Sequence, residues 1–351
     1  MNNKVLYIIE NKESAQFRYR CANIIEAIGE DERWNVDFIL RNEVKKMDFE
    51  NVDLLVIERQ TAKDNLLLDL IDKTHNNGVK VLFDLDDLIF DYRDLLLLMK
   101  STISKNIFYW AGYFWGIRRI ARRVDGFLTT NDFLGEKLKR SFGKDYKVIP
   151  NSLNDEQIQA SEEYLKKDKK HDEFKIGYFS GSPTHGRDFR MMESELVRFL
   201  EKYDDAKLRV VGYINFSETI QKLIECKRVE VLDLVDYKEL QRLMAEVDVN
   251  IAPLVINDFT NCKSELKFFE AAAAETTTIA SPSYTFSRAI KDGVNGFLAQ
   301  PGEWFDKLEY LYTHPEENKK IAKAAKKYAL KHYYGAEFLK EIEDAYDFFA
   351  K

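Results

Sequence analysis

The hydrophobic and polar positions along the chain form two series in which short apolar runs alternate with helical patterns. In the first, the expected strands cover residues 4–9, 35–40, 52–58, 79–84, 126–130 and 146–149, and helices are expected over 15–30 and 64–76. In the second, strands are expected over 174–179, 208–212, 229–232, 247–252 and 276–280. Apolar strands alternating with helices predict parallel sheets covered on both faces. The fold class is therefore α/β, with two Rossmann-like domains in tandem.

A charged, lysine-rich helix or linker separates the two series. Residues 155–172 contain almost no strand-forming side chains and follow Ile149-Pro150-Asn151. The predicted domains are an N-terminal one over 1–152 and a C-terminal one over 173–330, joined by a linker over 153–172. Residues 316–351 are expected to be helical with few breaks, and the last part, 331–351, is expected to pack back at the domain junction.

Composition narrows the class of protein. With 351 residues and 45% hydrophobic content, the chain can build two full cores. A formal net charge of -7 argues against a dedicated nucleic-acid-binding protein. The three cysteines, Cys21, Cys226 and Cys262, lie far apart in the sequence, which indicates neither a disulfide framework nor a zinc site. The first apolar run is too short for a signal peptide, and the cytoplasm is the expected location.

The segment 107–123 combines aromatic side chains with arginines. Its aromatic residues are Phe108, Tyr109, Trp110, Tyr113, Phe114 and Trp115, and its basic residues are Arg118, Arg119, Arg122 and Arg123. One interpretation is a helix packed on the sheet through Ile107, Trp110, Phe114, Ile117 and Ala121. The other is an interfacial helix that touches anionic lipid at the inner face of the cell membrane. Polar residues interrupt the apolar stretch 95–117, so it is not expected to cross a bilayer.

Two loops of the second series carry groups that suit a phosphate. Ligands of open parallel sheets bind beyond the carboxyl ends of the strands, where the loop 180–188 lies. Gly181 and Gly186 allow close backbone approach there, and Arg187 can donate two parallel hydrogen bonds. The run 263–270 opens a helix, whose free amides and dipole favour an anion beside Lys263 and Lys267. The structural alternatives are a turn that caps the helix from Asp188, and a helix capped by Ser264 with solvated lysines.

These residues carry a resemblance to a known family. The runs 177–185, 251–254, 263–272 and 290–299 resemble the donor domain of glycosyltransferase family 4. Tyr19-Arg20, Arg59, Phe83-Asp84-Leu85-Asp86-Asp87 and Ile149-Pro150-Asn151 look like the acceptor domain and junction of the same family. The resemblance implies a GT-B fold, in which two Rossmann-like domains face each other across a cleft.

The resemblance also implies roles for individual residues. Glu270 corresponds to the second glutamate of the family's paired motif and would bind the ribose hydroxyls of the nucleotide. The donor diphosphate would be neutralised by Arg187, Lys263 and Lys267, with further donor contacts from Gly181, Ser182, Thr184, His185, Ser264 and Glu265. The base would lie near Leu234 and Val235. The acceptor side would be lined by Arg18, Arg20, Arg59, Asp86 and Asp87, although such arginines equally form surface ion pairs.

One departure from the family pattern concerns the donor sugar. The first motif glutamate is replaced by Cys262, so sugar recognition must use other groups, among them Asp258, Asn261 or Glu265. The resemblance implies retention of anomeric configuration without a metal or other cofactor, because positive groups can stabilise the departing diphosphate. The expected donor is a UDP-, GDP- or dTDP-linked sugar. The expected acceptor is a glycan or lipid-linked glycan of a bacterial surface polysaccharide.

Two alternatives from other classes stay open at this point. The run 81–88 ends in Asp84, Asp86 and Asp87 and looks like the nucleophile motif of haloacid-dehalogenase-type phosphatases. The threonine expected after the acidic pair is missing, because Leu88 follows. The replacement at Cys262 makes a catalytically silent sugar-nucleotide binding module the other alternative.

Overall fold

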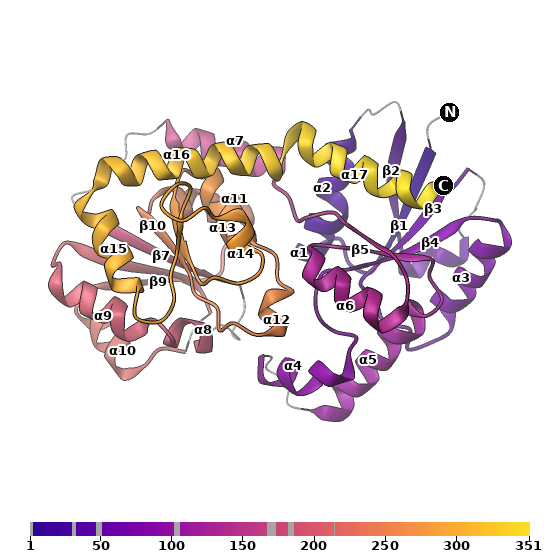
Figure 1. The fold of residues 1–351 in the computed structure, drawn as a ribbon, viewed down its shortest axis with the longest axis horizontal. Helices are drawn as coiled ribbons and strands as arrows, with labels where there is room; N and C mark the ends of the chain where they lie inside the picture. The colour runs from indigo at the N-terminus through magenta and orange to yellow at the C-terminus, as the bar shows by residue number, and fades with distance from the viewer. Residues whose placement is uncertain are drawn as a thin grey trace. The chain divides into compact units, whose positions relative to one another are not determined.

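The computed structural model describes residues 3–29, 33–46, 51–101, 106–166, 173–181, 186–213 and 215–351. Contacts divide the chain into two compact units, each described here by itself (Figure 1). Unit 1 comprises residues 1–154, 261–264 and 331–351, and unit 2 comprises residues 155–260 and 265–330. The short segment 261–264 therefore belongs to unit 1, although the residues on both sides of it belong to unit 2.

Unit 1 is built on a six-stranded sheet in the order β2-β1-β3-β4-β5-β6, and all of its pairings are parallel. Its strands are β1 (Asn3–Ile9), β2 (Trp34–Leu40), β3 (Leu54–Glu58), β4 (Lys80–Leu85), β5 (Gly126–Thr129) and β6 (Tyr146–Val148). The predicted strands of the first series are thus confirmed, with ends that differ by one or two residues. The strand order reverses direction at β1, which places a crevice beyond the carboxyl ends of β1 and β3.

The helices of unit 1 lie between these strands and at the end of the chain. They are α1 (Ala15–Phe17), α2 (Asn23–Ile28), α3 (Leu66–Asn76), α4 (Leu95–Ser101), α5 (Ile107–Ala121), α6 (Asp132–Phe142) and α17 (Gly335–Ala350), with a π-helical turn over Arg18–Ala22. On one face of the sheet, Val5, Tyr7 and Ile9 pack in one core with residues of α2 and α17. The last helix therefore completes the core of unit 1.

Unit 2 is built on a second six-stranded sheet, in the order β12-β11-β10-β7-β8-β9, again with every pairing parallel. Its strands are β7 (Phe174–Ser180), β8 (Ala206–Gly212), β9 (Val229–Leu232), β10 (Val249–Ala252), β11 (Thr277–Ala280) and β12 (Phe297–Leu298). Its helices are α7 (Asp155–Leu165), α8 (Gly186–Arg190), α9 (Glu193–Lys202), α10 (Glu218–Glu225), α11 (Tyr237–Ala245), α12 (Asp258–Asn261), α13 (Leu266–Ala273), α14 (Phe286–Ala289), α15 (Trp304–Thr313) and α16 (Pro315–His332). The second predicted sheet is confirmed, and β12 is an addition that the sequence pattern did not indicate.

The charged stretch after residue 154 and the C-terminal stretch both form helices. The stretch 155–165, part of the segment predicted as a helix or linker, is the helix α7 of unit 2, where it packs against α11 and α13. The C-terminal stretch is two helices, because the chain turns between α16 and α17 at Gly335, whose φ is 72°. Glycine adopts this left-handed conformation without the steric cost that a side chain would add.

Candidate functional site

The strand order of unit 2 places a candidate site between two neighbouring strands. β7 and β10 lie side by side, but the chain continues from β7 towards β8 on one side and from β10 towards β11 on the other. Connections that leave in opposite directions open a crevice beyond the carboxyl ends of the two strands. The loops that follow Ser180 and Ala252 border this crevice.

Helix α8, which follows β7 in the sequence, is anchored to the loop after β10. A carboxylate oxygen of Asp188 in α8 accepts a hydrogen bond of 2.9 Å from the backbone N–H of Val255. Gly181 and Arg187 are both exposed at this edge of unit 2. Ser182, Thr184 and His185, which we predict to contact the donor, lie outside the described residues. The sequence did not indicate that Asp188 makes this contact.

The neighbouring strand end leaves no room for a side chain. Gly212, the last residue of β8, has a φ of 92°, and an added Cβ would lie 2.1 Å from the carbonyl oxygen of Ser180. The same carbonyl accepts a hydrogen bond of 3.1 Å from the N–H of Tyr213. The Cδ1 atom of Leu234 would lie 3.5 Å from that Cβ, and Leu234 itself is exposed. Leu234 and the half-buried Val235 therefore offer an apolar surface beside the crevice.

Helix α13 brings a lysine to the same sheet. The Nζ atom of Lys267 lies 4.8 Å from the centre of the Tyr178 ring in β7. The side-chain amide of Asn250 in β10 donates a hydrogen bond of 2.9 Å to the carbonyl oxygen of Lys267. These contacts fix the first turn of α13 against β7 and β10, the two strands that border the crevice. A cation held there, beside helix amides, suits an anionic ligand.

Ser264 does not cap α13. The helix begins after Glu265, and no side chain in the described part of the chain caps it. The hydroxyl of Ser264 instead accepts a hydrogen bond of 3.1 Å from the side-chain amide of Asn151 in unit 1. The interpretation of Lys263–Glu270 as a helix capped by Ser264 is therefore wrong, because a partner in unit 1 holds that hydroxyl.

Glu270 is buried on α13, with 4% of its surface exposed. Its Oε1 atom accepts a hydrogen bond of 3.1 Å from the side-chain amide of Gln157 in α7. Gln157 is itself fully buried, so it orients the carboxylate. Sequence reasoning missed Gln157, because it lies in a charged stretch, predicted as a helix or linker, that carries no motif.

A second cluster of charged groups lies in unit 1, beyond the carboxyl ends of β3 and β4. The guanidinium of Arg59 lies 2.9 Å from Asp86 and 2.7 Å from Asp87. Lys263, from the segment 261–264, lies 3.7 Å from Asp87. The structure thus brings together Arg59, Asp86 and Asp87, three of the residues predicted for the acceptor, and it adds Lys263 to them.

The segment 261–264 is held in unit 1 by polar side chains. The amide of Asn131, at the N-terminus of α6, donates a hydrogen bond of 2.8 Å to the carbonyl oxygen of Cys262. The Cys262 side chain is fully buried. At the position of the family's first glutamate, this protein therefore has a packed side chain and a backbone contact.

Arg20 binds inside unit 1. Its guanidinium makes two hydrogen bonds of 3.0 Å to Asp84 and one of 2.5 Å to the carbonyl oxygen of Ile149, and it is 1% exposed. Arg18 packs on the ring of Tyr19, with its guanidinium carbon 4.6 Å from the ring centre. The π-helical turn over Arg18–Ala22 directs Arg20 into the protein, and in this conformation Arg20 binds Asp84 and backbone groups.

The carboxyl groups at this edge have perturbed pKa values. Burial raises the pKa of Asp84 to about 6, in spite of the opposing charge of Arg20. Burial also raises the pKa of Asp86 above its ordinary value, while the charges of Lys263 and Arg59 outweigh burial and lower the pKa of Asp87. Two adjacent carboxyls with pKa values shifted in opposite directions are typical of a site that binds or moves protons.

Glu58 at the end of β3 predicts a pH dependence of stability. Burial raises its pKa from 4.5 to about 8, and its Oε1 atom has no hydrogen-bond partner among the residues that the structure describes. Because the folded state disfavours the ionised form, Glu58 stabilises fully below about pH 4.5, and this contribution is lost as the pH rises to about 8.

The Glu58→Gln variant should remove this dependence. We expect the difference in unfolding free energy, wild type minus variant, to decrease across this pH window. The decrease should be on the order of 1 kcal/mol per pH unit. Urea unfolding at several pH values measures it. A difference that stays constant between pH 5 and pH 8 would contradict the assignment.

The phosphatase alternative does not fit this arrangement. Asp84 would be the nucleophile, but it is 1% exposed and both of its oxygens accept hydrogen bonds from Arg20. A carboxylate in this state cannot reach a phosphoryl group. Within the run 81–88, Asp84 therefore has a structural role, while Asp86 and Asp87 stay partly exposed.

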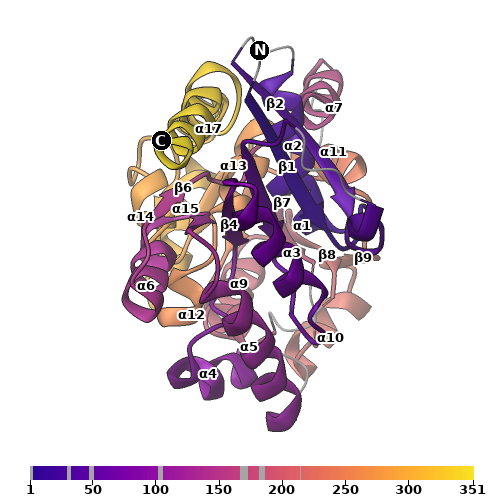
Figure 2. The ribbon, with the colours of Figure 1, turned by 90° about the vertical axis from the view of Figure 1, so that its right-hand side faces the viewer.

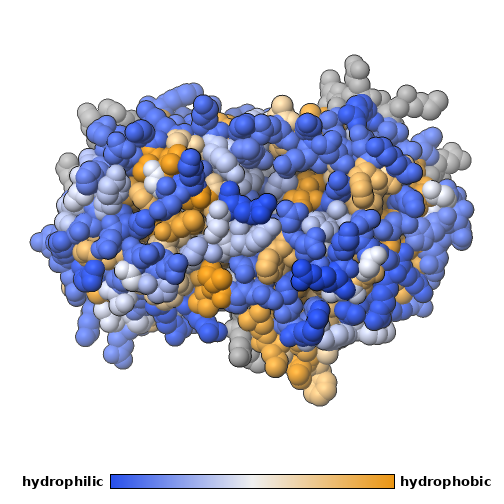
Figure 3. All heavy atoms as spheres, viewed as in Figure 1, coloured by the Kyte–Doolittle hydropathy of each residue, from blue (hydrophilic) through white to orange (hydrophobic). Residues whose placement is uncertain are grey.

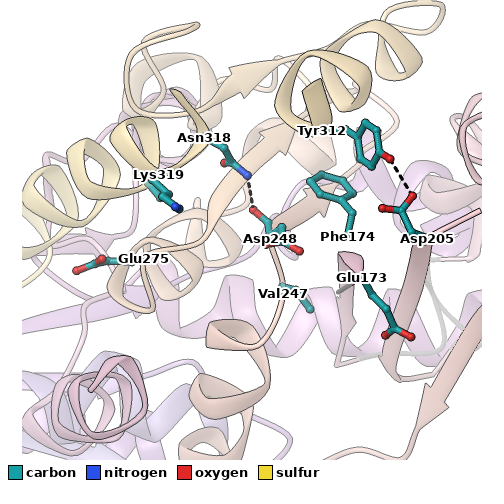
Figure 4. Close-up of a pocket in the computed structure, with 10 residues that line it drawn as sticks. Glu173, Phe174, Asp205, Val247, Asp248, Glu275, Tyr312, Asn318 and Lys319 are labelled. Atoms are coloured by element: carbon teal, nitrogen blue, oxygen red, sulfur yellow. Dashed lines mark hydrogen bonds between the residues drawn. The ribbon is translucent and has the colours of Figure 1, made fainter. Parts of the chain in front are cut away.

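A cavity of about 520 Å³ lies elsewhere in unit 2 (Figure 4). It is lined by residues that precede or begin the strands, among them Phe174 at the start of β7 and Asp248 just before β10. Tyr312 donates a hydrogen bond of 2.8 Å to Asp205, and Asn318 donates one of 3.1 Å to the carbonyl oxygen of Asp248. The cavity is therefore at the amino edge of the sheet, opposite the edge where ligands of open parallel sheets bind.

Comparison with known proteins shows the fold and a family match over one segment of the chain. Residues 175–314 match the family model described as glycosyl transferases group 1. Similar solved structures include a glycosyltransferase from Rickettsia africae ESF-5, 14% identical with a TM-score of 0.68, over 100% of this chain and 99% of that one. No curated protein matches this sequence.

Two further similar structures also match over nearly the full length of both chains. Sucrose-phosphate synthase from Thermosynechococcus elongatus is 14% identical with a TM-score of 0.66, over 99% of this chain and 98% of that one. Anabaena Alr3699/HepE in complex with UDP and glucose is 15% identical with a TM-score of 0.63, over 98% of this chain and 99% of that one. The GT-B fold implied by the sequence is confirmed, and the matched family segment includes β7, β10 and α13.

Proposed function

We propose that this chain, which has a GT-B fold, is a glycosyltransferase of the group 1 type that moves a sugar from a nucleotide-sugar donor to a glycan or lipid-linked glycan. The observation that carries the proposal is the crevice at β7 and β10, with Lys267 beside it, inside the segment that matches the family. HepE, which has a similar fold, is recorded with UDP-glucose as well as with UDP. A UDP-, GDP- or dTDP-linked sugar is therefore the proposed donor.

The donor side of the reaction uses charge and orientation. Lys267, Arg187 and the first-turn amides of α13 would stabilise the diphosphate as it departs. Glu270, oriented by Gln157, would accept hydrogen bonds from two ribose hydroxyls. Leu234 and Val235 would pack on the base. Gly181 would allow the diphosphate to approach the backbone, and Ser182, Thr184, His185, Ser264 and Glu265 would supply further contacts.

The acceptor side uses the cluster of unit 1. Asp86 and Asp87, held by Arg59, would bind acceptor hydroxyls, and Arg18 stays in the proposed set. The buried Arg20 instead binds Asp84, and in this conformation it does not reach an acceptor. In the transfer, the bond from the anomeric carbon to the diphosphate breaks and a bond to the acceptor oxygen forms. The acceptor proton passes to a leaving phosphate oxygen, so the reaction retains configuration and uses no metal or other cofactor. We propose bacterial surface polysaccharide synthesis in the cytoplasm as the setting.

A thermal-shift series tests donor binding. A ligand that binds only the folded state at about 100 times its Kd stabilises that state by roughly 2.7 kcal/mol. We expect UDP, GDP or dTDP to raise the Tm by several degrees, equally with and without EDTA. The Glu270→Ala, Lys267→Ala double variant should lose this shift.

Turnover separates the transferase from the silent binding module. Release of nucleoside diphosphate from a nucleotide-sugar, with a product of unchanged anomeric configuration by NMR, would support transfer. Ligand-induced stabilisation without any release would instead support the module, and stabilisation that survives in the double variant would contradict the site.

A further inference from the structure

The charge of residues 95–123 differs from that of the whole chain. This stretch contains no Asp or Glu, and its basic residues are Lys100, Lys105, Arg118, Arg119, Arg122 and Arg123. The complete chain, by contrast, carries a net charge of -7. A stretch that carries only positive charges, in an acidic protein, favours a partner of the opposite charge.

Helix α5 exposes aromatic side chains on one face. Phe108 is 85% exposed and Trp115 is 51% exposed, and they lie one above the other at a spacing of seven residues. Ile107 and Tyr109 are also exposed, whereas Phe114, Ile117, Ile120 and Ala121 are buried. The packed-helix prediction is therefore confirmed for Phe114, Ile117 and Ala121 and wrong for Ile107. The N-terminal half of α5 projects its apolar side chains outward.

Helix α4 extends the same surface. α4 and α5 contact each other, and Leu96 of α4 is 65% exposed. The two helices lie side by side in both ribbon views (Figures 1 and 2). Figure 3 shows hydrophobic side chains gathered at the surface in this part of unit 1. We name the exposed side chains of Leu96, Ile107, Phe108, Tyr109 and Trp115 the aromatic ridge.

Arginines follow the aromatic ridge along α5. The guanidinium of Arg119 lies 4.5 Å from the Trp115 ring centre and donates hydrogen bonds to Ala62 and Asn65. Arg122 and Arg123 are exposed at the end of the helix, and Arg123 reaches Asp72. Apolar rings next to basic groups match the boundary between acyl chains and anionic headgroups.

We propose that the aromatic ridge and the arginines of α5 dock unit 1 on an anionic lipid bilayer. No helix in the described part of the chain is long and apolar enough to span a membrane, so the contact lies in the interface. A second copy of the chain fits this surface less well. Self-pairing would bring the basic residues of two such stretches together with no acidic residue in either to neutralise them.

Vesicle co-sedimentation tests the proposal with the full chain. We expect the wild type to bind vesicles of mixed phosphatidylglycerol and phosphatidylcholine, and to bind vesicles of phosphatidylcholine alone at least about ten-fold more weakly. Phe108→Ser combined with Trp115→Ser should weaken binding to the anionic vesicles by about ten-fold or more. Arg122→Gln should weaken it less and should reduce its dependence on salt.

The matched control is Phe348→Ser, which removes an exposed phenylalanine from α17 of the same unit and should leave vesicle binding unchanged. Equal binding to both kinds of vesicle, or full binding by the double variant, would overturn the proposal. Concentration-dependent dimerisation without lipid that the double variant abolishes would also overturn it. The UDP-induced thermal shift of the double variant is expected to stay intact, so a failure here is distinguishable from a failure of donor binding.

Discussion

Replacing Lys267 with methionine should lower kcat/KM for nucleotide-sugar turnover by about 10² to 10³. The ammonium group beside Tyr178 lies at the first turn of α13, where charge develops on the departing diphosphate in the proposed reaction. Its loss should reduce kcat strongly, because the interaction strengthens in the transition state. Steady-state release of nucleoside diphosphate measures the effect. The fold should be kept, since an interaction of this kind with a ring contributes only about 0.5–2 kcal/mol.

Lys326→Met is the matched control for this prediction. Lys326 lies in the same unit, on α16, and its Nζ atom is 3.2 Å from Glu275. The same change of side chain there should leave turnover near the wild-type rate. Equal losses of kcat/KM in both variants would show that Lys267 acts through general stability. An unchanged kcat/KM in Lys267→Met would exclude Lys267 from the site.

Replacing Arg20 with methionine should destabilise unit 1 by about 3–5 kcal/mol. Arg20 and Asp84 are each 1% exposed, and two hydrogen bonds of 3.0 Å join them. Removal of one partner leaves a charge buried without compensation, which costs far more than the loss of an exposed ion pair. Calorimetric unfolding measures the change as a lower Tm of the transition that belongs to unit 1.

Two comparisons make this prediction specific. Arg123→Met breaks the exposed pair with Asp72 in the same unit and should cost less than about 1 kcal/mol. The Arg20→Met, Asp84→Leu double variant removes both charges and should be more stable than Arg20→Met alone. If the double variant loses as much unfolding free energy as the two single variants lose together, the two groups act independently.

The sheets could be predicted from the sequence because their strands are buried on both faces. Runs such as Val5 to Ile9 and Leu54 to Ile57 are continuously apolar, and this is the pattern that a covered parallel sheet requires. β12 escaped prediction because it has only two residues, too few for any periodicity. The C-terminal stretch 316–351 was predicted as helical with few breaks, and the structure has one interruption there, between the end of α16 at His332 and the start of α17 at Gly335.

The candidate site could be predicted only in part. Lys267 is indicated by its place near the start of a helix and Glu270 by the family resemblance, but Gln157, which orients Glu270, is distant in sequence and follows no motif. In unit 1 the arginines looked equivalent in the sequence. Tertiary packing separates them, because the π-helical turn buries Arg20 on Asp84 while Arg59 stays partly exposed with Asp86 and Asp87. Burial of a charge depends on the partners that the fold supplies, which local sequence does not contain.

Hydrogen exchange with and without UDP, GDP or dTDP tests the central claim most directly. The claim is that a nucleoside diphosphate binds in unit 2 at the carboxyl edge of β7 and β10. The predicted result is slower exchange in the loops after Ser180 and Ala252 and in the first turn of α13, with no change around the cavity at the amino edge of the sheet. Protection confined to unit 1 or to that cavity would contradict the claim.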